Sequence, residues 1–179
     1  MKYFNVPVSL KEVFGEQQTF IEVFVTLVIS LVTSLVIYLY LYPSNNVSIL
    51  ALIVGFILVW DVLAGCIANF TYGTNQYYAV REKSRWVFIG IHFHIIAIAW
   101  LLDGPLGLSV GVWGFTIASA IAVNLLKDHK LQLFVAANFV FVGLVVIFTL
   151  AMPMWFSLVS VFFLFKVVLS FAVDHYKNN

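Results

Sequence analysis

The sequence contains little charge. Asp, Glu, Lys and Arg together make up 9% of its 179 residues, whereas an ordinary soluble domain is roughly a quarter charged. Hydrophobic residues make up 63%, and this combination is typical of a chain dissolved in lipid rather than in water. The formal net charge is only +1, which provides no long-range attraction to nucleic acid. We therefore expect a membrane protein without a nucleic-acid partner.

Cysteine is nearly absent as well. Cys66 is the only one and lies within an apolar run, so an internal disulfide is excluded and a thiolate-based mechanism is disfavoured. The sequence also lacks a P-loop, a nucleophile motif and an established metal-ligand spacing. His92 and His94 look like a ligand pair, but on a regular helix they point about 200° apart, and no carboxylate cluster accompanies them. We expect no metal site, and no cofactor is identified.

Six long apolar segments dominate the chain instead. About 20 apolar residues are needed to cross a hydrocarbon core of roughly 30 Å. The qualifying segments are 20–42, 47–70, 86–102, 106–126, 131–152 and 154–173. The first is far longer than the apolar region of a secretory signal, so we expect it to be retained. The predicted fold is all-α: a transmembrane domain of six helices over 20–173, with an N-terminal segment 1–19 and a tail 174–179.

The positions of lysine and arginine predict the orientation, because cytoplasmic loops are enriched in them. With the N-terminus inside, the outer loops 43–46 and 103–105 and the turn at Pro153 carry none. Eight of the nine cations then lie on the inner side: Lys2, Lys11, Arg81, Lys83, Arg85, Lys127, Lys130 and Lys177. We expect a multi-pass protein of the plasma membrane with both termini in the cytoplasm.

The N-terminal segment carries a helix-start pattern. Ser9 is expected to be the N-cap, Glu12 to complete a capping box, and Val8 to pack against Val13. The pattern predicts a short amphipathic helix that lies on the inner membrane surface.

Polar residues within the predicted spans fall at a common depth. Asp61, His94, Asn138 and Lys166 each lie roughly 11–13 Å from the cytoplasmic end of their span, at a rise of about 1.5 Å per residue, and Thr26 lies slightly shallower. Such residues are costly in lipid and usually face the interior of the bundle. The sequence therefore predicts a polar layer to which five helices contribute.

Further polar residues lie between this layer and the cytoplasm. Asn69 and Asn124 sit near the inner ends of their spans, while the outer half of the bundle contains few polar groups. The longest connection, 71–85, includes Tyr77 and Arg81 among other polar and basic residues, a mixture that suits contact with lipid phosphates, although positive-inside topology alone would produce most of it. The polar path is thus expected to open inward.

Helical faces refine these expectations. Asp61, Gly65 and Asn69 follow at intervals of four and form one stripe, which should face protein because small residues let helices approach closely. In the third span we expect His94, rather than His92, to point inward. In the fourth span a ladder of small residues is expected to serve close helix packing; it comprises Gly107, Gly111, Gly114 and Ala118.

The residue types suggest roles. Asp61 and His94 would act as acid and base, and Lys166 as an anion partner or electrostatic stabiliser. The expected ligand-binding residues are Asn69, Asn138, Thr26, Asn124, Tyr77 and Arg81. An alternative without function remains open for each: Asp61 and Lys166 form a buried ion pair, and His94 and Asn138 make ordinary interhelical hydrogen bonds.

The one-sided polar layer favours a membrane-embedded enzyme or binding protein for a lipid-like amphiphile. The alternative is a small transporter or channel for protons, ions or a polar solute, since Asp, His and Lys within spans are typical of proton relays. A second alternative is an accessory or structural subunit. The expected partners are membrane lipids, together with a second copy of the chain or another membrane subunit.

Overall fold

The computed structural model describes residues 2–43 and 47–177. These ranges contain six helices that are long and apolar enough to cross a membrane: Phe20–Leu41, Ile49–Ala68, Glu82–Leu101, Leu106–Leu125, Gln132–Thr149 and Met154–Phe171. The prediction of six such helices is confirmed. The loop predicted over 43–46 falls mostly outside the described residues.

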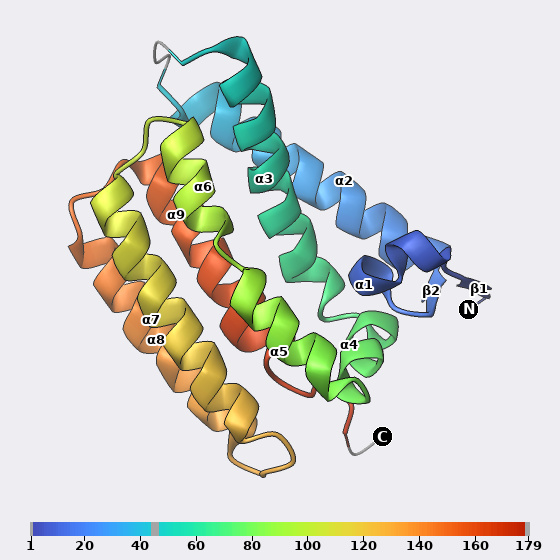
Figure 1. Ribbon diagram of the computed structural model, residues 1–179. Helices are drawn as coiled ribbons and strands as arrows, with labels where there is room; N and C mark the ends of the chain where they lie inside the picture. The colour runs from blue at the N-terminus through green and yellow to red at the C-terminus, as the bar shows by residue number, and fades with distance from the viewer. Residues whose placement is uncertain (1, 44–46, 178–179) are drawn as a thin grey trace.

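The helices follow one another with short connections (Figure 1). The N-terminal segment consists of β1 (Tyr3–Asn5), the 3-10 turn η1 (Val8–Leu10), α1 (Lys11–Phe14) and β2 (Gln17–Thr19). The first three spans and their connection are α2 (Phe20–Val36) with the π-helical η2 (Ile37–Leu41), α3 (Ile49–Ala68), α4 (Tyr72–Ala79), and α5 (Glu82–Ile91) with α6 (His94–Leu101). The last three spans are α7 (Leu106–Leu125), α8 (Gln132–Thr149), and α9 (Met154–Leu164) with the π-helical η3 (Phe165–Phe171).

The first span begins with a capping box. The Thr19 side chain accepts a hydrogen bond from the backbone N–H of Glu22, and the Glu22 carboxylate accepts one from the backbone N–H of Thr19 at 2.9 Å. This reciprocal pair satisfies donors that the first helical turn leaves free. It also explains why a carboxylate stands at the start of an otherwise apolar segment.

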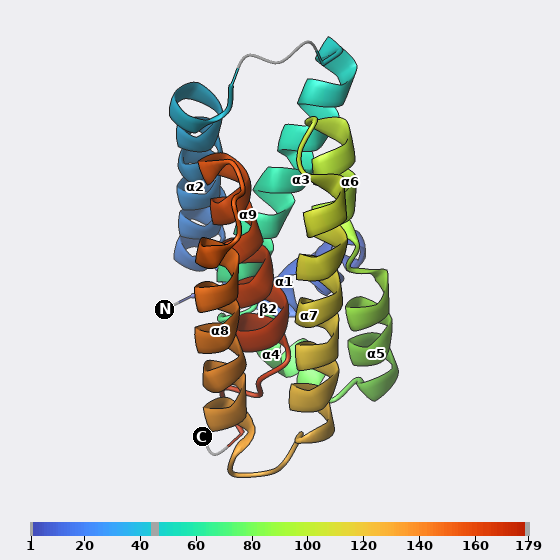
Figure 2. The same ribbon diagram turned by 90° about the vertical axis from the view of Figure 1, so that its left-hand side faces the viewer.

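The last span is the centre of the bundle. Of its most apolar window, 67% is buried, against 22% to 33% for the other five. α9 and η3 contact α3, α7 and α8, whereas α2 packs mainly on α3 at the periphery (Figure 2). The close approach of α8 to α9 depends on Gly143, where an added Cβ would lie 2.5 Å from a Leu164 methyl group. Both chain termini lie toward the same end of the bundle, here called the terminal end.

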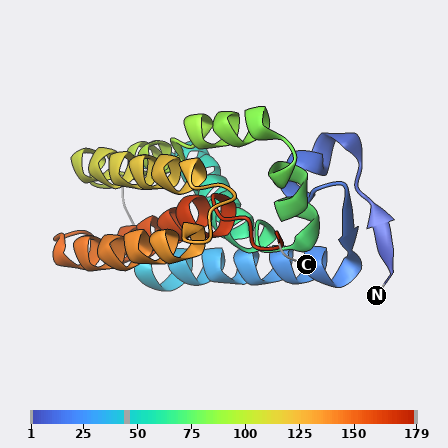
Figure 3. The same ribbon diagram turned by 90° about the horizontal axis from the view of Figure 1, so that it is seen from below.

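The N-terminal segment docks on α4 at the terminal end, and it also contacts α2 and α3 of the bundle (Figure 3). Gly15 adopts a positive φ of 71° at the end of α1. A Cβ at Gly15 would overlap the carbonyl of Gly73, and one at Gly73 would overlap the carbonyl of Gln17. Two glycines therefore allow the two backbones to touch, and the Thr74 hydroxyl adds a hydrogen bond to Val13 O at 3.1 Å.

This segment corrects two expectations. It is not all-α, because β1 and β2 pair antiparallel with Tyr3 opposite Thr19. Ser9 is not an N-cap: it lies inside η1, which follows Pro7, and α1 begins only at Lys11. Val8 is 83% exposed and makes no staple. The predicted helix forms over a single turn, Lys11–Phe14, because Gly15 ends it. The position of this segment on the membrane surface stays a prediction.

The glycine ladder of α7 does not pack as expected. In the described part of the chain, no neighbouring atom lies within 4 Å of a Cβ added at Gly107, Gly111 or Gly114. α7 instead buries the face that carries Val112, Thr116, Ser119, Ala120 and Val123. The prediction of close packing was wrong because these larger side chains, and not the glycines, fill the space beside α8 and η3.

Candidate functional site

Three predicted site residues meet inside the bundle, although they come from three different spans. Lys166 Nζ lies 2.7 Å from Asp61 Oδ2 and 3.3 Å from the backbone oxygen of Asp61. His94 Nε2 lies 3.6 Å from the same carboxylate oxygen. The carboxylate of Asp61 therefore lies between a cation and an imidazole.

The position of Lys166 depends on two backbone features. Lys166 is buried near the start of η3, where the last span changes from α-helical to π-helical hydrogen bonding. Such π-helical turns occur frequently at functional sites. Across from it, Gly65 leaves space for the lysine stem, because an added Cβ would lie 2.8 Å from Nζ. Gly65 and Asn69 of the predicted stripe thus face protein, whereas the Asp61 side chain is 47% exposed.

The third span breaks at His92 and Phe93, whereas the sequence predicts one continuous helix over 86–102. His92 ends α5 with φ −81° and ψ 70°, and α6 begins at His94. The His92 ring donates from Nδ1 to the carbonyl of Phe88, which replaces the backbone hydrogen bond lost at the break. Non-helical backbone at membrane depth is tolerated where it is buried in protein or lines a cavity.

The break brings both histidines to one site. The ring centroids of His92 and His94 are 5.0 Å apart, and both rings line the same cavity. The expectation that only His94 points inward was wrong, because it assumed a regular helix. No proline marks the break, although Gly90 precedes it by two residues.

A cavity of about 370 Å³ surrounds this cluster of Asp61, His92, His94 and Lys166, here called the ionic cluster. It runs between α1, α4, α5 and the cluster. Its apolar wall consists of side chains from α1 and α5: Val13, Val87, Phe88 and Ile91. Glu12, Lys83 and Ser84 line it nearer the terminal end. We refer to the ionic cluster as the base of the cavity and to Glu12, Lys83 and Ser84 as its mouth.

Tyr78 also lines the cavity, from α4 outside the spans. Its hydroxyl donates to the backbone oxygen of Glu12 at 2.8 Å. Burial raises the pKa of the Tyr78 hydroxyl well above its ordinary value, with the negative charge of Glu12 adding to the shift. Tyr78 thus stays protonated and holds α1 over the cavity rather than serving as a base.

The bundle is closed beyond the ionic cluster, toward the end opposite the termini. Ile95, Ile98 and Leu102 of the third span are fully buried there. Trp155 and Phe156 of α9 are buried at the same end. The polar residues consequently lie on the terminal side of a packed apolar plug.

Two residues predicted for the polar layer lie elsewhere. Asn138 is exposed on α8, and its amide donates to Phe134 O of the same helix at 2.7 Å. Thr26 is buried on α2, which packs on α3, but the residues that line the cavity do not include it. The prediction that Asn138 joins the layer was wrong, since the depth of a residue along a helix does not fix the face on which it lies; Thr26 faces the interior but not the cavity.

Asn124 takes part in a separate polar group at the terminal end. Arg85 is buried, and it donates to Asn124 Oδ1 and to Ala172 O, each at 2.8 Å. Gln132 also donates to Ala172 O at 3.0 Å, and Asn75 donates to Val173 O at 2.9 Å. We call Asn75, Arg85, Asn124 and Gln132 the C-terminal clamp, because three of them donate to carbonyls where the last span ends and Asn124 holds the Arg85 guanidinium.

Three of these clamp residues, Asn75, Arg85 and Gln132, were not among the predicted site residues. In the sequence, Arg85 indicates only the orientation of the chain in the membrane. Asn75 and Gln132 lie at span boundaries, where polar residues are common. Asn69 is buried near the same end of α3, and its amide nitrogen has no hydrogen-bond partner among the described residues. It does not line the cavity.

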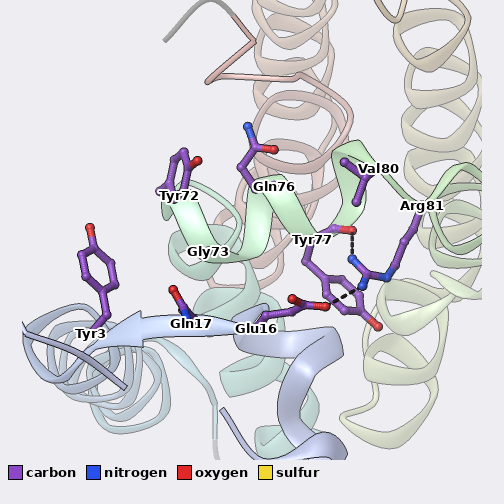
Figure 4. A pocket seen from close by; sticks show the side chains of 9 residues that line it. All are labelled: Tyr3, Glu16, Gln17, Tyr72, Gly73, Gln76, Tyr77, Val80 and Arg81. Atoms are coloured by element: carbon purple, nitrogen blue, oxygen red, sulfur yellow. Dashed lines mark hydrogen bonds and ion pairs between the residues drawn. The ribbon is translucent and has the colours of Figure 1, made fainter. Parts of the chain in front are cut away.

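Tyr77 and Arg81 belong to a different pocket of about 500 Å³ between the N-terminal segment and α4 (Figure 4). Arg81 Nη2 lies 2.6 Å from Glu16 Oε1, and Arg81 Nη1 donates to Tyr77 O at 2.9 Å. The guanidinium also lies over the Tyr77 ring, 4.0 Å from its centroid. Glu16 already neutralises the charge that was expected to contact lipid phosphates.

Neither the arrangement of metal-ligand side chains nor the comparison with known proteins assigns a function to this site. Within the described ranges, no group of three or more His, Cys, Asp or Glu side chains is arranged to hold a metal ion. Comparisons of the chain with family models, curated proteins and solved structures find no match.

Proposed function

We propose that this chain is a membrane-embedded protein that takes the polar head of an amphiphile into the cavity beside Asp61, His94 and Lys166. One observation carries the proposal: an ion pair and two imidazoles form the base of a cavity whose wall is apolar. A ligand with a polar head and an apolar chain matches both surfaces, and ligand cavities of this kind occupy roughly 300–1,000 Å³.

The residues would divide the work by type. Asp61 and His94 supply a carboxylate and an imidazole 3.6 Å apart, suited to moving a proton to or from the bound head group. Lys166 holds the carboxylate in place and can stabilise developing negative charge. Val87 and Ile91 are exposed on α5 beside the cavity, so an apolar chain could lie along them and continue into lipid.

Access from the inner leaflet of the plasma membrane belongs to the same proposal. The helix α5, whose first turn carries the cavity-lining residues Lys83 and Ser84, begins at the terminal end (Figure 1). Positive-inside enrichment favours the cytoplasm for that end, because eight of the nine cations precede, follow or connect spans there. Glycosylation mapping or cysteine labelling of the two termini tests this orientation.

Native mass spectrometry of protein purified in a mild detergent tests the binding function. We expect a co-purifying amphiphile in the unmodified protein and its loss in Ile91→Trp, which fills the cavity wall. Asn138→Ala is the matched control, since Asn138 lies outside the cavity, and it should retain the ligand. Absence of any bound amphiphile from the unmodified protein, or equal retention in Ile91→Trp, would overturn the proposal.

Proton or solute transport is the second candidate, favoured by one specific observation. The third span is broken at the ionic cluster, and broken helices commonly form the binding sites of transporters. The buried plug of Ile95, Ile98 and Leu102 would have to open for transport. Proton flux into liposomes that disappears in Asp61→Asn would support this candidate over the first.

A further inference from the structure

Formal charges in the cavity are balanced. Asp61 pairs with Lys166 at the base. Glu12 and Lys83 supply one charge of each sign nearer the mouth. An ionised head group would bring one more charge beside the buried Lys166 ammonium, and a charge that is removed from water without compensation is costly. The balance therefore favours an uncharged head group.

Two buried ring nitrogens in the ionic cluster have no hydrogen-bond partner in the described part of the chain: His92 Nε2 and His94 Nδ1. The opposite nitrogen of His92 is hydrogen-bonded, and that of His94 lies 3.6 Å from Asp61 Oδ2. His92 Nδ1 faces the carbonyl of Phe88, which only accepts, so Nδ1 carries the hydrogen. The Asp61 carboxylate near His94 Nε2 favours a hydrogen there. In the neutral rings, both unpartnered nitrogens are consequently acceptors.

A buried acceptor without a donor is costly, and such groups are normally satisfied in folded proteins. A bound molecule can supply the missing donors only if it carries O–H or N–H groups. The Lys166 ammonium has three hydrogens, and its recorded partners are two oxygens of Asp61, so one hydrogen is available to an acceptor. Hydroxyl groups both donate and accept, whereas a carboxylate or a phosphate diester only accepts.

We propose that the ligand is an uncharged amphiphile with a hydroxyl-bearing head group, such as a glycerol or sugar head on an acyl or isoprenoid chain. This inference rests on the proposed function and narrows its ligand class. His92 and His94 accept hydrogen bonds from the hydroxyls, Lys166 donates one, and the wall formed by Phe88 and Ile91 contacts the chain.

Three probes that share one oleoyl chain test the inference: 1-monooleoylglycerol, its dimethyl ether and 1-oleoyl lysophosphatidate. Dissociation constants are measured with the purified full-length chain by titration under native mass spectrometry. We expect monooleoylglycerol to bind at least about tenfold more tightly than either other probe, since two buried hydrogen bonds are at stake.

Variants separate the two parts of the inference. His94→Phe should reduce the preference for monooleoylglycerol over its ether to below about threefold; His92→Phe should do the same, provided that its thermal unfolding shows a folded protein, because His92 also supports the helix break. Glu12→Gln removes one negative charge from the cavity lining and should strengthen lysophosphatidate binding more than that of monooleoylglycerol. Asn138→Ala should alter none of these constants.

The failures are distinguishable. Tighter binding of lysophosphatidate than of monooleoylglycerol, or equal binding of the ether, overturns this inference while the amphiphile function stands. Binding of all three probes that is unchanged in Ile91→Trp shows that none occupies the cavity and overturns both.

Discussion

Two groups of buried polar side chains lie within one bundle, and they differ in what they bind. The C-terminal clamp donates mainly to backbone carbonyls of the last span, including Ala172 O and Val173 O. The ionic cluster instead joins side chains to one another, and two of its ring nitrogens have no partner among the described residues. Polar groups that satisfy the backbone stabilise the fold, whereas polar groups gathered around a cavity remain available to a ligand.

Arg85→Met is expected to have the largest effect on stability and none on ligand selectivity. It removes the donor to Asn124 Oδ1 and one donor to Ala172 O, both in a buried place. The free energy of unfolding should fall by about 3 kcal/mol, which thermal unfolding in detergent measures. Arg81→Met is the control, because the pair with Glu16 is partly exposed and its loss should cost less than about 1 kcal/mol. If both changes lowered the free energy of unfolding equally, the C-terminal clamp would contribute no more to stability than a partly exposed ion pair.

Lys166→Met should have the second-largest effect on stability, and it distinguishes a packing role of the ionic cluster from a ligand-binding role. Removing the cation leaves the Asp61 carboxylate unpaired, and because that side chain is 47% exposed we expect a loss of only about 2 kcal/mol. The double change Asp61→Asn with Lys166→Met should recover most of the stability but not the binding of monooleoylglycerol. Recovery of both would show that the cluster serves packing alone, as expected for an accessory subunit.

Gly65→Ala should have a smaller effect, concentrated on the ionic cluster. The new Cβ displaces the end of the Lys166 side chain, which is flexible, so stability should fall by about 1 kcal/mol or less. Monooleoylglycerol binding should weaken severalfold. Gly107→Ala is the matched control in another span, where no atom lies near the added methyl group, and helix propensity predicts a change between zero and about 1 kcal/mol in the stabilising direction. Weaker ligand binding in both variants would indicate a general effect of glycine replacement.

The smallest expected effect is the dependence of stability on pH at the terminal end. Burial lowers the pKa of His175, which lies beyond the last span beside the clamp. The unfolded chain then binds a proton more readily than the folded one, so this histidine's contribution is present above the unfolded pKa and is lost as pH falls below it. The melting temperature should decrease from pH 7 to pH 5, and His175→Phe should decrease less. Identical slopes for both proteins would contradict this.

The sequence predicted the depth at which the ionic cluster lies along the spans, but not all of the residues that form it. Asp61, His94 and Lys166 were expected at one depth because helical rise is nearly constant along a span. Asn138 had the same depth and lies on the outside, since the rotation of a helix about its axis depends on which neighbours it packs against. His92 was excluded by the geometry of a regular helix, and the break at Phe93 removed that geometry.

Composition and apolar run length determined that six helices can span a membrane, because lipid requires every backbone group to be bonded within the segment. The ion pair of Asp61 and Lys166 was among the alternatives that the sequence left open. Only the tertiary structure decided that Gly65 makes room for the lysine and that Arg85 caps the last span. It also decided that, in the described part of the chain, no neighbouring atom lies within 4 Å of a Cβ added at the α7 glycines. These outcomes depend on contacts between residues distant in sequence, which local periodicity does not encode.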